Sequence, residues 1–308
     1  MIETLTAIAP VFLIIVIGYV FCRTNLVRES VWSAIEHICF YLLFPFLIVR
    51  TLGRADLTSV PVLDFLTVLV VAIAGMSLLL LMLRNFVSEE DLTGPTFTSL
   101  FQGATRFHGF MALAVIAPLY GDDGITLTAI ALSVMVPLLN AVSVIVLSVY
   151  ATEQQSYSLS SLFLRVLKNP LIIACGVGLI VNFVGVPNVL FNTIEIIGSG
   201  GLGLALLCVG AGLRLNHAAQ HKLLLSAGVL IRLLGMPSLI IFMSWIIGLD
   251  GLPRTVAIIA GAVPTAASAY VMARKMGGDA ELMSNILTFQ VLGSFITLPV
   301  FIYLAEAL

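Results

Sequence analysis

Long apolar stretches, separated by short polar connections, run through the whole chain of 308 residues. A helix needs about 20 predominantly apolar residues to cross a lipid bilayer. The pattern predicts ten membrane-spanning helices, at residues 4–21, 32–52, 61–83, 95–119, 124–148, 169–184, 189–213, 222–247, 252–272 and 282–305. Only 10% of the residues are charged, whereas soluble domains carry roughly 25%. We therefore expect an all-α polytopic membrane protein.

Basic residues alternate between rich and poor connections. The connections after odd-numbered segments hold nine: Arg23, Arg28, Arg84, Arg165, Lys168, Arg214, Lys222, Arg274 and Lys275. The connections after even-numbered segments hold three: Arg50, Arg54 and Arg254. Cytoplasmic loops carry an excess of Lys and Arg. The count thus predicts a multi-pass protein of the cell inner (plasma) membrane, with both termini external or periplasmic.

A polar stretch at the midpoint leaves five segments on each side, so the two halves would have opposite orientations. Pro10 and Gly18 in the first segment recur as Pro170 and Gly178 in the sixth, at an offset of 160 positions. We expect residues 1–150 to form the first five-helix inverted repeat, 151–161 a cytoplasmic linker, and 162–308 the second repeat.

The fourth and ninth segments are interrupted near their centres. Arg106, His108 and Gly109 interrupt the fourth, and Pro264 with Thr265 interrupts the ninth, 156 positions further on. Charged or unwound backbone at membrane depth survives only where protein or a water-filled cavity solvates it. Corresponding breaks in inverted halves indicate the central site of a transporter. We therefore predict that helices 4 and 9 are broken and cross each other.

The N-terminus of a half-helix at such a break would present unpaired N–H groups and a partial positive charge, which favours an anion. We expect these half-helices to begin near Phe110 and at Thr265, with Gly109 relaxing the first break and Pro264 occupying the first helical position of the second. The candidate substrate-binding residues are Arg106, His108, Gly109, Pro264, Thr265, Ser268, Asn140 and Gln290.

Structural roles are the alternative for most of these candidates. Arg106 would then cap carbonyl groups freed by the break, His108 would be a neutral histidine held by backbone, and Pro264 would only kink a helix. Asn140 and Gln290 would join helices through hydrogen bonds. For Arg232, which is also deep in an apolar segment, we favour pairing with carbonyls at the crossing over a contribution to the anion field.

Several functional classes find no support in the chain. Nucleotide-binding and zinc-protease motifs are lacking, so we expect no enzyme, no cofactor, no bound metal, no nucleic-acid partner and no ATP-driven pump. All sixteen acidic residues lie in connections or near segment ends. An ion exchanger with broken helices normally buries carboxylates near the crossing. Coupling to a proton or sodium stays open, since backbone carbonyls and Gln290 can hold sodium, and so does assembly as a homodimer.

The motifs resemble those of the auxin efflux carrier family of bacterial and plant permeases, over essentially the full length. The resemblance rests on Leu43–Pro45, Arg106–Phe110, Pro118–Asp122, Ala260–Ala266 and Gln290–Ser294. It implies a fold related to the bile acid/sodium symporters, in which a scaffold of helices 1, 2, 6 and 7 faces a crossover group of helices 3–5 and 8–10.

The resemblance also implies alternating-access transport of a small organic anion, such as malate, malonate or an auxin-like acid. Many members carry Asn or a small polar residue at the position of His108, or proline at that of Arg106, so substrate identity does not carry over. The rival functions are a sodium- or proton-coupled symporter or exchanger of the bile acid symporter type, and a non-transporting membrane sensor.

Overall fold

The computed structural model describes residues 2–55, 61–151, 168–214 and 222–308, and within these ranges it contains helices and no β-strand. Nearly the whole expected linker, residues 152–161, lies outside the described residues. By length and apolar composition, seven helical stretches of the described residues are able to cross a membrane, and the helices Pro170–Val184 and Gly251–Ala262 are apolar but shorter. The ten-span inverted repeat stays a prediction.

Contacts divide the chain into two compact units. Unit 1 comprises residues 1–61, 109–137 and 160–212, and unit 2 comprises residues 62–108, 138–159 and 213–308. The family resemblance had placed residues 109–137, which belong to predicted helices 4 and 5, in the crossover group of helices 3–5 and 8–10. That expectation is wrong, because these residues make their contacts with the helices of unit 1.

Unit 1 is built from helices on both sides of the sequence midpoint. Its helices are α1 (Ile2–Arg23), α2 (Glu29–Ile38), α3 (Phe44–Arg54), the first part of α6 (Gly109–Tyr150), α8 (Pro170–Val184), α9 (Asn188–Ser199) and α10 (Gly201–Ala211). Predicted segments four and five share the label α6, but the backbone at Gly121, with φ of 57° and ψ of −149°, is not helical and separates two helices there. The expected connection at residues 120–123 is therefore confirmed, and it turns at a glycine, the residue that adopts positive φ without steric cost.

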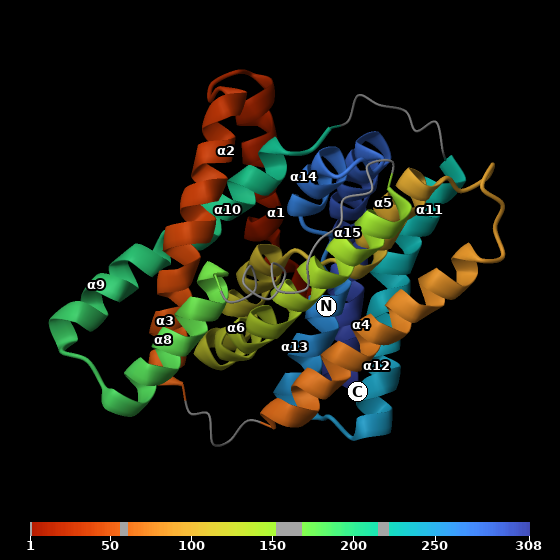
Figure 1. Cartoon of the computed structure of the whole chain (residues 1–308). Helices are drawn as coiled ribbons and strands as arrows, with labels where there is room; N and C mark the ends of the chain where they lie inside the picture. The colour runs from red at the N-terminus through yellow and green to blue at the C-terminus, as the bar shows by residue number, and fades with distance from the viewer. Residues whose placement is uncertain (1, 56–60, 152–167, 215–221) are drawn as a thin grey trace. The chain divides into compact units, whose positions relative to one another are not determined.

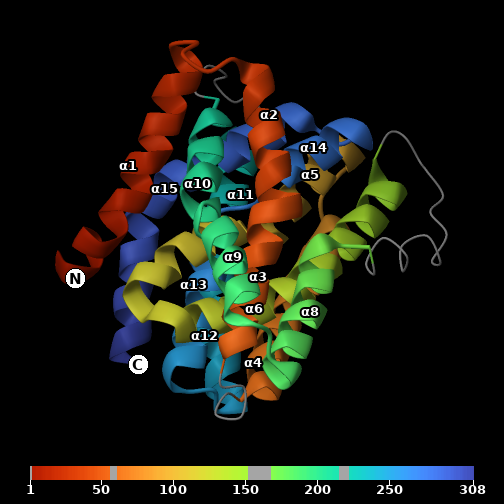
Figure 2. The same ribbon diagram turned by 90° about the vertical axis from the view of Figure 1, so that its left-hand side faces the viewer.

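Glycines bring helices of unit 1 into backbone contact. α1 and α10 lie side by side (Figures 1 and 2). A Cβ on Gly210 would overlap the carbonyl oxygen of Ile15, and one on Gly18 would overlap that of Leu207. Small residues allow such approach in membranes, where van der Waals packing drives the association of helices.

Unit 2 contains both helix breaks. Its helices are α4 (Val62–Arg84), α5 (Gly94–Thr105), the end of α6, α11 (Lys222–Leu230), α12 (Met236–Ile247), α13 (Gly251–Ala262), α14 (Ser268–Lys275) and α15 (Ala280–Ala307). One π-helical turn, η2 (Ile231–Gly235), joins α11 to α12 just before Pro237; its counterpart in unit 1, η1 (Cys39–Leu43), precedes Pro45. Proline lacks an N–H and clashes with the preceding turn, which the wider π turn accommodates.

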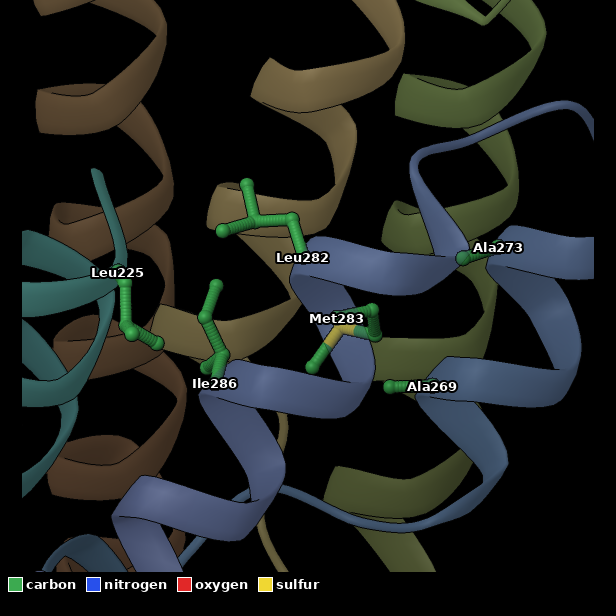
Figure 3. Close-up of a cluster of buried hydrophobic side chains, with 6 residues drawn as sticks. All are labelled: Leu225, Ala269, Ala273, Leu282, Met283 and Ile286. Carbon is green, nitrogen blue, oxygen red and sulfur yellow. The ribbon is translucent and has the colours of Figure 1, made fainter. Parts of the chain in front are cut away.

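An apolar cluster fixes α14 within unit 2. Ala269 and Ala273 of α14 belong to one cluster with side chains of α15 and α11, and Figure 3 shows the two alanines facing Met283 of α15. The cluster consists of Leu225, Ala269, Ala273, Leu282, Met283 and Ile286. Burial of these side chains sets the position of α14, and so of the helix end that begins at Ser268.

Candidate functional site

Both predicted interruptions are present, and they touch within unit 2. α5 ends at Thr105 and the next helix begins at Gly109, while α13 ends at Ala262 and α14 begins at Ser268. The backbone N–H of His108 donates to the carbonyl oxygen of Pro264 at 2.7 Å. The non-helical segments 106–108 and 263–267 are therefore hydrogen-bonded to each other.

The expected start of the second half-helix is wrong by three residues. Pro264 is not its first residue, because α14 begins only at Ser268. The backbone N–H of Thr265 donates instead to Oε1 of Gln290 at 2.8 Å, and its hydroxyl donates to the carbonyl oxygen of Gln102 at 3.3 Å. Contacts with other helices thus hold the backbone extended just beyond the proline.

Gly109 also plays a different part from the one expected. Its φ is not positive, so its backbone uses no conformation reserved for glycine. A Cβ at this position would overlap Cδ2 of Leu132, another residue of unit 1. The glycine therefore provides space for close packing at the start of α6, one residue before the predicted Phe110.

Arg232 covers the carbonyl ends of both broken helices. Its Nε donates to the carbonyl oxygen of Val263 at 2.8 Å, its Nη2 to that of Ala260 at 2.9 Å, and its Nη1 to that of Thr105 at 3.5 Å. Only 1% of the residue is exposed. A helix C-terminus carries a partial negative charge, so this guanidinium stabilises two such ends. The favoured structural role is confirmed.

Gln290 joins three elements at the same crossing. Besides accepting from Thr265, its amide nitrogen donates to the carbonyl oxygens of Gly103 and Gly228, each at 2.9 Å. Both amide hydrogens and the oxygen are thus engaged within unit 2. This is the helix-joining role that the sequence had left as the alternative to substrate binding.

Arg106 is surrounded by neutral groups. Its Nη2 donates to Oγ of Ser268 at 2.8 Å, and its Nη1 lies 3.4 Å from Oγ of Ser143 and 3.2 Å from Sδ of Met272. Its Nε has no hydrogen-bond partner among the described residues, although the residue is only 5% exposed. The sequence had offered the alternative that Arg106 caps carbonyl groups freed by the break. The structure shows that Arg232, and not Arg106, donates to those carbonyl groups.

The guanidinium of Arg106 lies at the start of α14, where it contacts Ser268. Ser268 is the first residue of α14, no side chain caps that helix end, and the serine is exposed. The helix dipole favours an anion at such an end, while the N–H groups of Ala269 and Tyr270 already donate to the carbonyl oxygens of Ala266 and Ala267. Asn140 is half-buried on α6, three residues before Ser143 and therefore on a neighbouring part of the same face.

Of the sequence candidates, unit 2 brings together Arg106, His108, Pro264, Thr265, Ser268 and Gln290, whereas Gly109 belongs to unit 1. Sequence reasoning missed Ser143, Met272 and Gln102. The amide of Gln102 is fully buried, and neither its Nε2 nor its Oε1 has a partner among the described residues. The signal for Gln102 was its position one helical turn before Arg106 in an apolar segment.

Comparisons with known proteins agree with one another. The sequence profile of a family described as membrane transport protein matches residues 3–302. An uncharacterized transporter of Methanothermobacter thermautotrophicus is 23% identical over 297 residues, which is 95% of each chain. The uncharacterized transporter YfdV of Escherichia coli is 26% identical over 211 residues, or 64% of each chain.

Proposed function

Because the chain belongs to the membrane transport protein family, to which its resemblance to the auxin efflux carriers had pointed, we propose that it is a secondary transporter for a small organic anion. It works by alternating access, and the broken helices of unit 2 carry the anion site. The substrate is a carboxylate, in the class of malate, malonate or an auxin-like acid.

The observation that carries this proposal is the environment of Arg106. A buried charge is costly unless it is paired, and no carboxylate pairs with this guanidinium in the described part of the chain. A substrate carboxylate would supply the missing countercharge at the moment of binding. Pairing with an anion would therefore offset the cost of burying the guanidinium of Arg106.

The geometry of Arg106 suits a two-point contact. Nε and Nη2 form one edge of the planar guanidinium, and Arg binds carboxylates bidentately through such an edge. Among the residues that the structure describes, Nε has no hydrogen-bond partner and Nη2 donates to the exposed Ser268 alone. A carboxylate on this edge would bridge both nitrogens and accept from the serine hydroxyl, close to the start of α14.

The proposed membrane arrangement is ten spans in two inverted repeats, with both termini external. The matching positions of the two breaks and the nine-to-three distribution of basic residues support it. The corresponding halves would begin at residues 1 and 162, with the linker 151–161 in the cytoplasm. The protein works without a cofactor and resides in the inner (plasma) membrane.

Uptake into proteoliposomes tests the proposal. The purified chain is reconstituted and given labelled carboxylates, with and without sodium and pH gradients. We expect saturable uptake of at least one carboxylate, and near-complete loss of it in Arg106→Gln. Arg254→Gln is the matched control, because Arg254 pairs with exposed Asp250 at 3.0 Å.

The outcomes separate the rival functions. Uptake that strictly requires sodium or a proton gradient would favour the coupled symporter or exchanger. Carboxylate binding without any uptake would favour the membrane sensor. Uptake that is equal in Arg106→Gln and wild type would remove Arg106 from the site, and no carboxylate uptake or binding at all would refute the organic-anion proposal.

A further inference from the structure

The amide of Gln102, one turn before Arg106, is a buried polar group of unit 2 in which neither polar atom is paired within the described part of the chain. It is 0% exposed, and both of its side-chain polar atoms lack a hydrogen-bond partner among the described residues. Buried polar side chains are nearly always hydrogen-bonded, because an unmet donor or acceptor loses its hydration without replacement. A buried amide with neither polar atom paired among the described residues is therefore a place where a polar occupant would be stabilised.

The register of α5 against the end of α6 places Gln102 beside the Arg106 site. The Phe97 and Tyr150 rings meet edge to face at 5.1 Å between centroids. Thr98, the residue after Phe97, and Leu147, three residues before Tyr150, both lie near Gly278, where a Cβ would be 2.9 Å from Oγ1 of Thr98 and 3.2 Å from Cδ2 of Leu147. The two helices thus run antiparallel.

The next helical turn toward the break leads from Thr98 to Gln102 on α5. Because the helices are antiparallel, the corresponding turn of α6 leads from Leu147 back to Ser143. Ser143 is already in contact with the guanidinium of Arg106. Gln102 is therefore level with the groups that surround Arg106, on the face of α5 that also carries Thr98.

The chemistry of the occupant follows from the amide. A primary amide offers two donors and an acceptor, so its natural partner both donates and accepts, as a hydroxyl group does. The charge of the occupant follows from the two arginines. Arg232 is engaged by three carbonyl groups, which leaves Arg106 as the guanidinium available at the breaks in the described residues of unit 2.

We propose that Gln102 is a second substrate-contacting residue and that the substrate is a small monocarboxylate bearing a hydroxyl group. This inference rests on the proposed function and narrows its substrate class from carboxylates in general to hydroxylated monocarboxylates, which leaves out the dicarboxylates malate and malonate. The carboxylate pairs with Arg106, and the hydroxyl, on a carbon near the carboxylate, pairs with the amide of Gln102. Dicarboxylates are disfavoured because, among the described residues at the two breaks, Arg232 is already engaged by carbonyl groups and no further guanidinium is left for a second charge.

Matched acids that differ by one hydroxyl group test the assignment. Binding of propionate and lactate, and of butyrate and 3-hydroxybutyrate, is measured by calorimetry on the detergent-solubilised full chain, with succinate and malate as dicarboxylates. We expect each hydroxy acid to bind about tenfold more tightly than its partner, the scale of one buried hydrogen bond whose loss leaves a polar group unmet. The dicarboxylates should bind more weakly than lactate.

Variants of Gln102 assign the preference to its amide. Gln102→Leu should bring the affinities for lactate and propionate together by weakening lactate alone, and should not lower the thermal unfolding midpoint. Gln102→Met is a second variant of similar shape in case the first fails to fold. Thr98→Val is the matched control, one turn away on the same helix face, and should keep the preference because Thr98 donates to its own Pro95 carbonyl at 2.7 Å.

Three results would overturn the inference. Equal affinities for the paired acids in wild type would show that the amide of Gln102 does not bind the substrate hydroxyl. A preference that survives in both Gln102 variants would show that another residue causes it. Neither result would contradict a carboxylate site at Arg106. Tighter binding of malate than of lactate would refute the monocarboxylate class. If none of the acids binds to the wild-type protein or to Arg106→Gln, the proposed function itself is refuted.

Discussion

Replacing Arg232 by methionine would remove the charge that covers both broken helix ends while keeping much of the side chain's volume. The change leaves the carbonyl oxygens of Val263 and Ala260 unpaired in a site where Arg232 is only 1% exposed. A hydrogen bond to a charged group contributes about 1.5–3 kcal/mol. Two short bonds therefore contribute about 3–6 kcal/mol, and the third, at 3.5 Å, adds little.

The lost stabilisation is partly offset, because the methionine variant does not have to desolvate a charged guanidinium on folding. We expect a net destabilisation of about 3 kcal/mol, which lowers the unfolding midpoint by roughly 6 °C for a chain of this size. The measurement is thermal unfolding of the detergent-solubilised protein. Arg232→Lys should fall in between, since an ammonium group cannot span the carbonyls that the planar guanidinium reaches.

Arg254→Met is the matched control for this experiment. Arg254 pairs with Asp250, whose side chain is 82% exposed, and exposed ion pairs contribute about 0–1 kcal/mol. Its unfolding midpoint should stay within about 2 °C of wild type. If Arg232→Met unfolds at the wild-type temperature, the carbonyl contacts do not stabilise the crossing, and the division of roles between the two arginines is refuted.

Three further changes probe the breaks and the topology. Pro264→Ala adds an N–H that favours continuous helix, and should lower the initial uptake rate at least tenfold at unchanged membrane insertion; uptake near the wild-type rate would mark Pro264 as a tolerated kink. Gly109→Ala should destabilise unit 1 by about 1–3 kcal/mol through overlap with Leu132, and the additional change Leu132→Ala should cost less in this background than in wild type. In a cysteine-free background, a cysteine at Ser88 should label only from the cytoplasm and one at Asp250 only from outside; the reverse would invert the topology.

The sequence locates the helices and their breaks because the bilayer imposes strict rules. Backbone polar groups in lipid must be paired within the segment, so long apolar runs indicate helices. Arg106 and Pro264 stand out because each violates a rule for an unbroken span. The start of α14 could not be predicted, since it depends on the bond from Thr265 to Gln290, which lies 25 positions away in sequence.

The roles of the two deeply buried arginines also could not be predicted from the sequence. In the sequence, Arg106 and Arg232 are both cations inside apolar segments, and nothing local separates their roles. Only the fold reveals that one guanidinium covers backbone carbonyls and the other faces hydroxyl groups and a thioether. Ser143 and Gln102 escaped notice for a related reason, because a single polar residue on an apolar helix gains significance only from what lies opposite.

The separation of these two arginines bears on how such a carrier diversifies. Arg232 and Gln290 hold the crossing together entirely through backbone groups, which any substitution of neighbouring side chains leaves in place. The proposed substrate contacts, Arg106, Gln102 and Ser268, take no part in those bonds to the backbone. In the proposed site, single substitutions at these three positions would therefore alter substrate preference, while selection for folding acts on other residues.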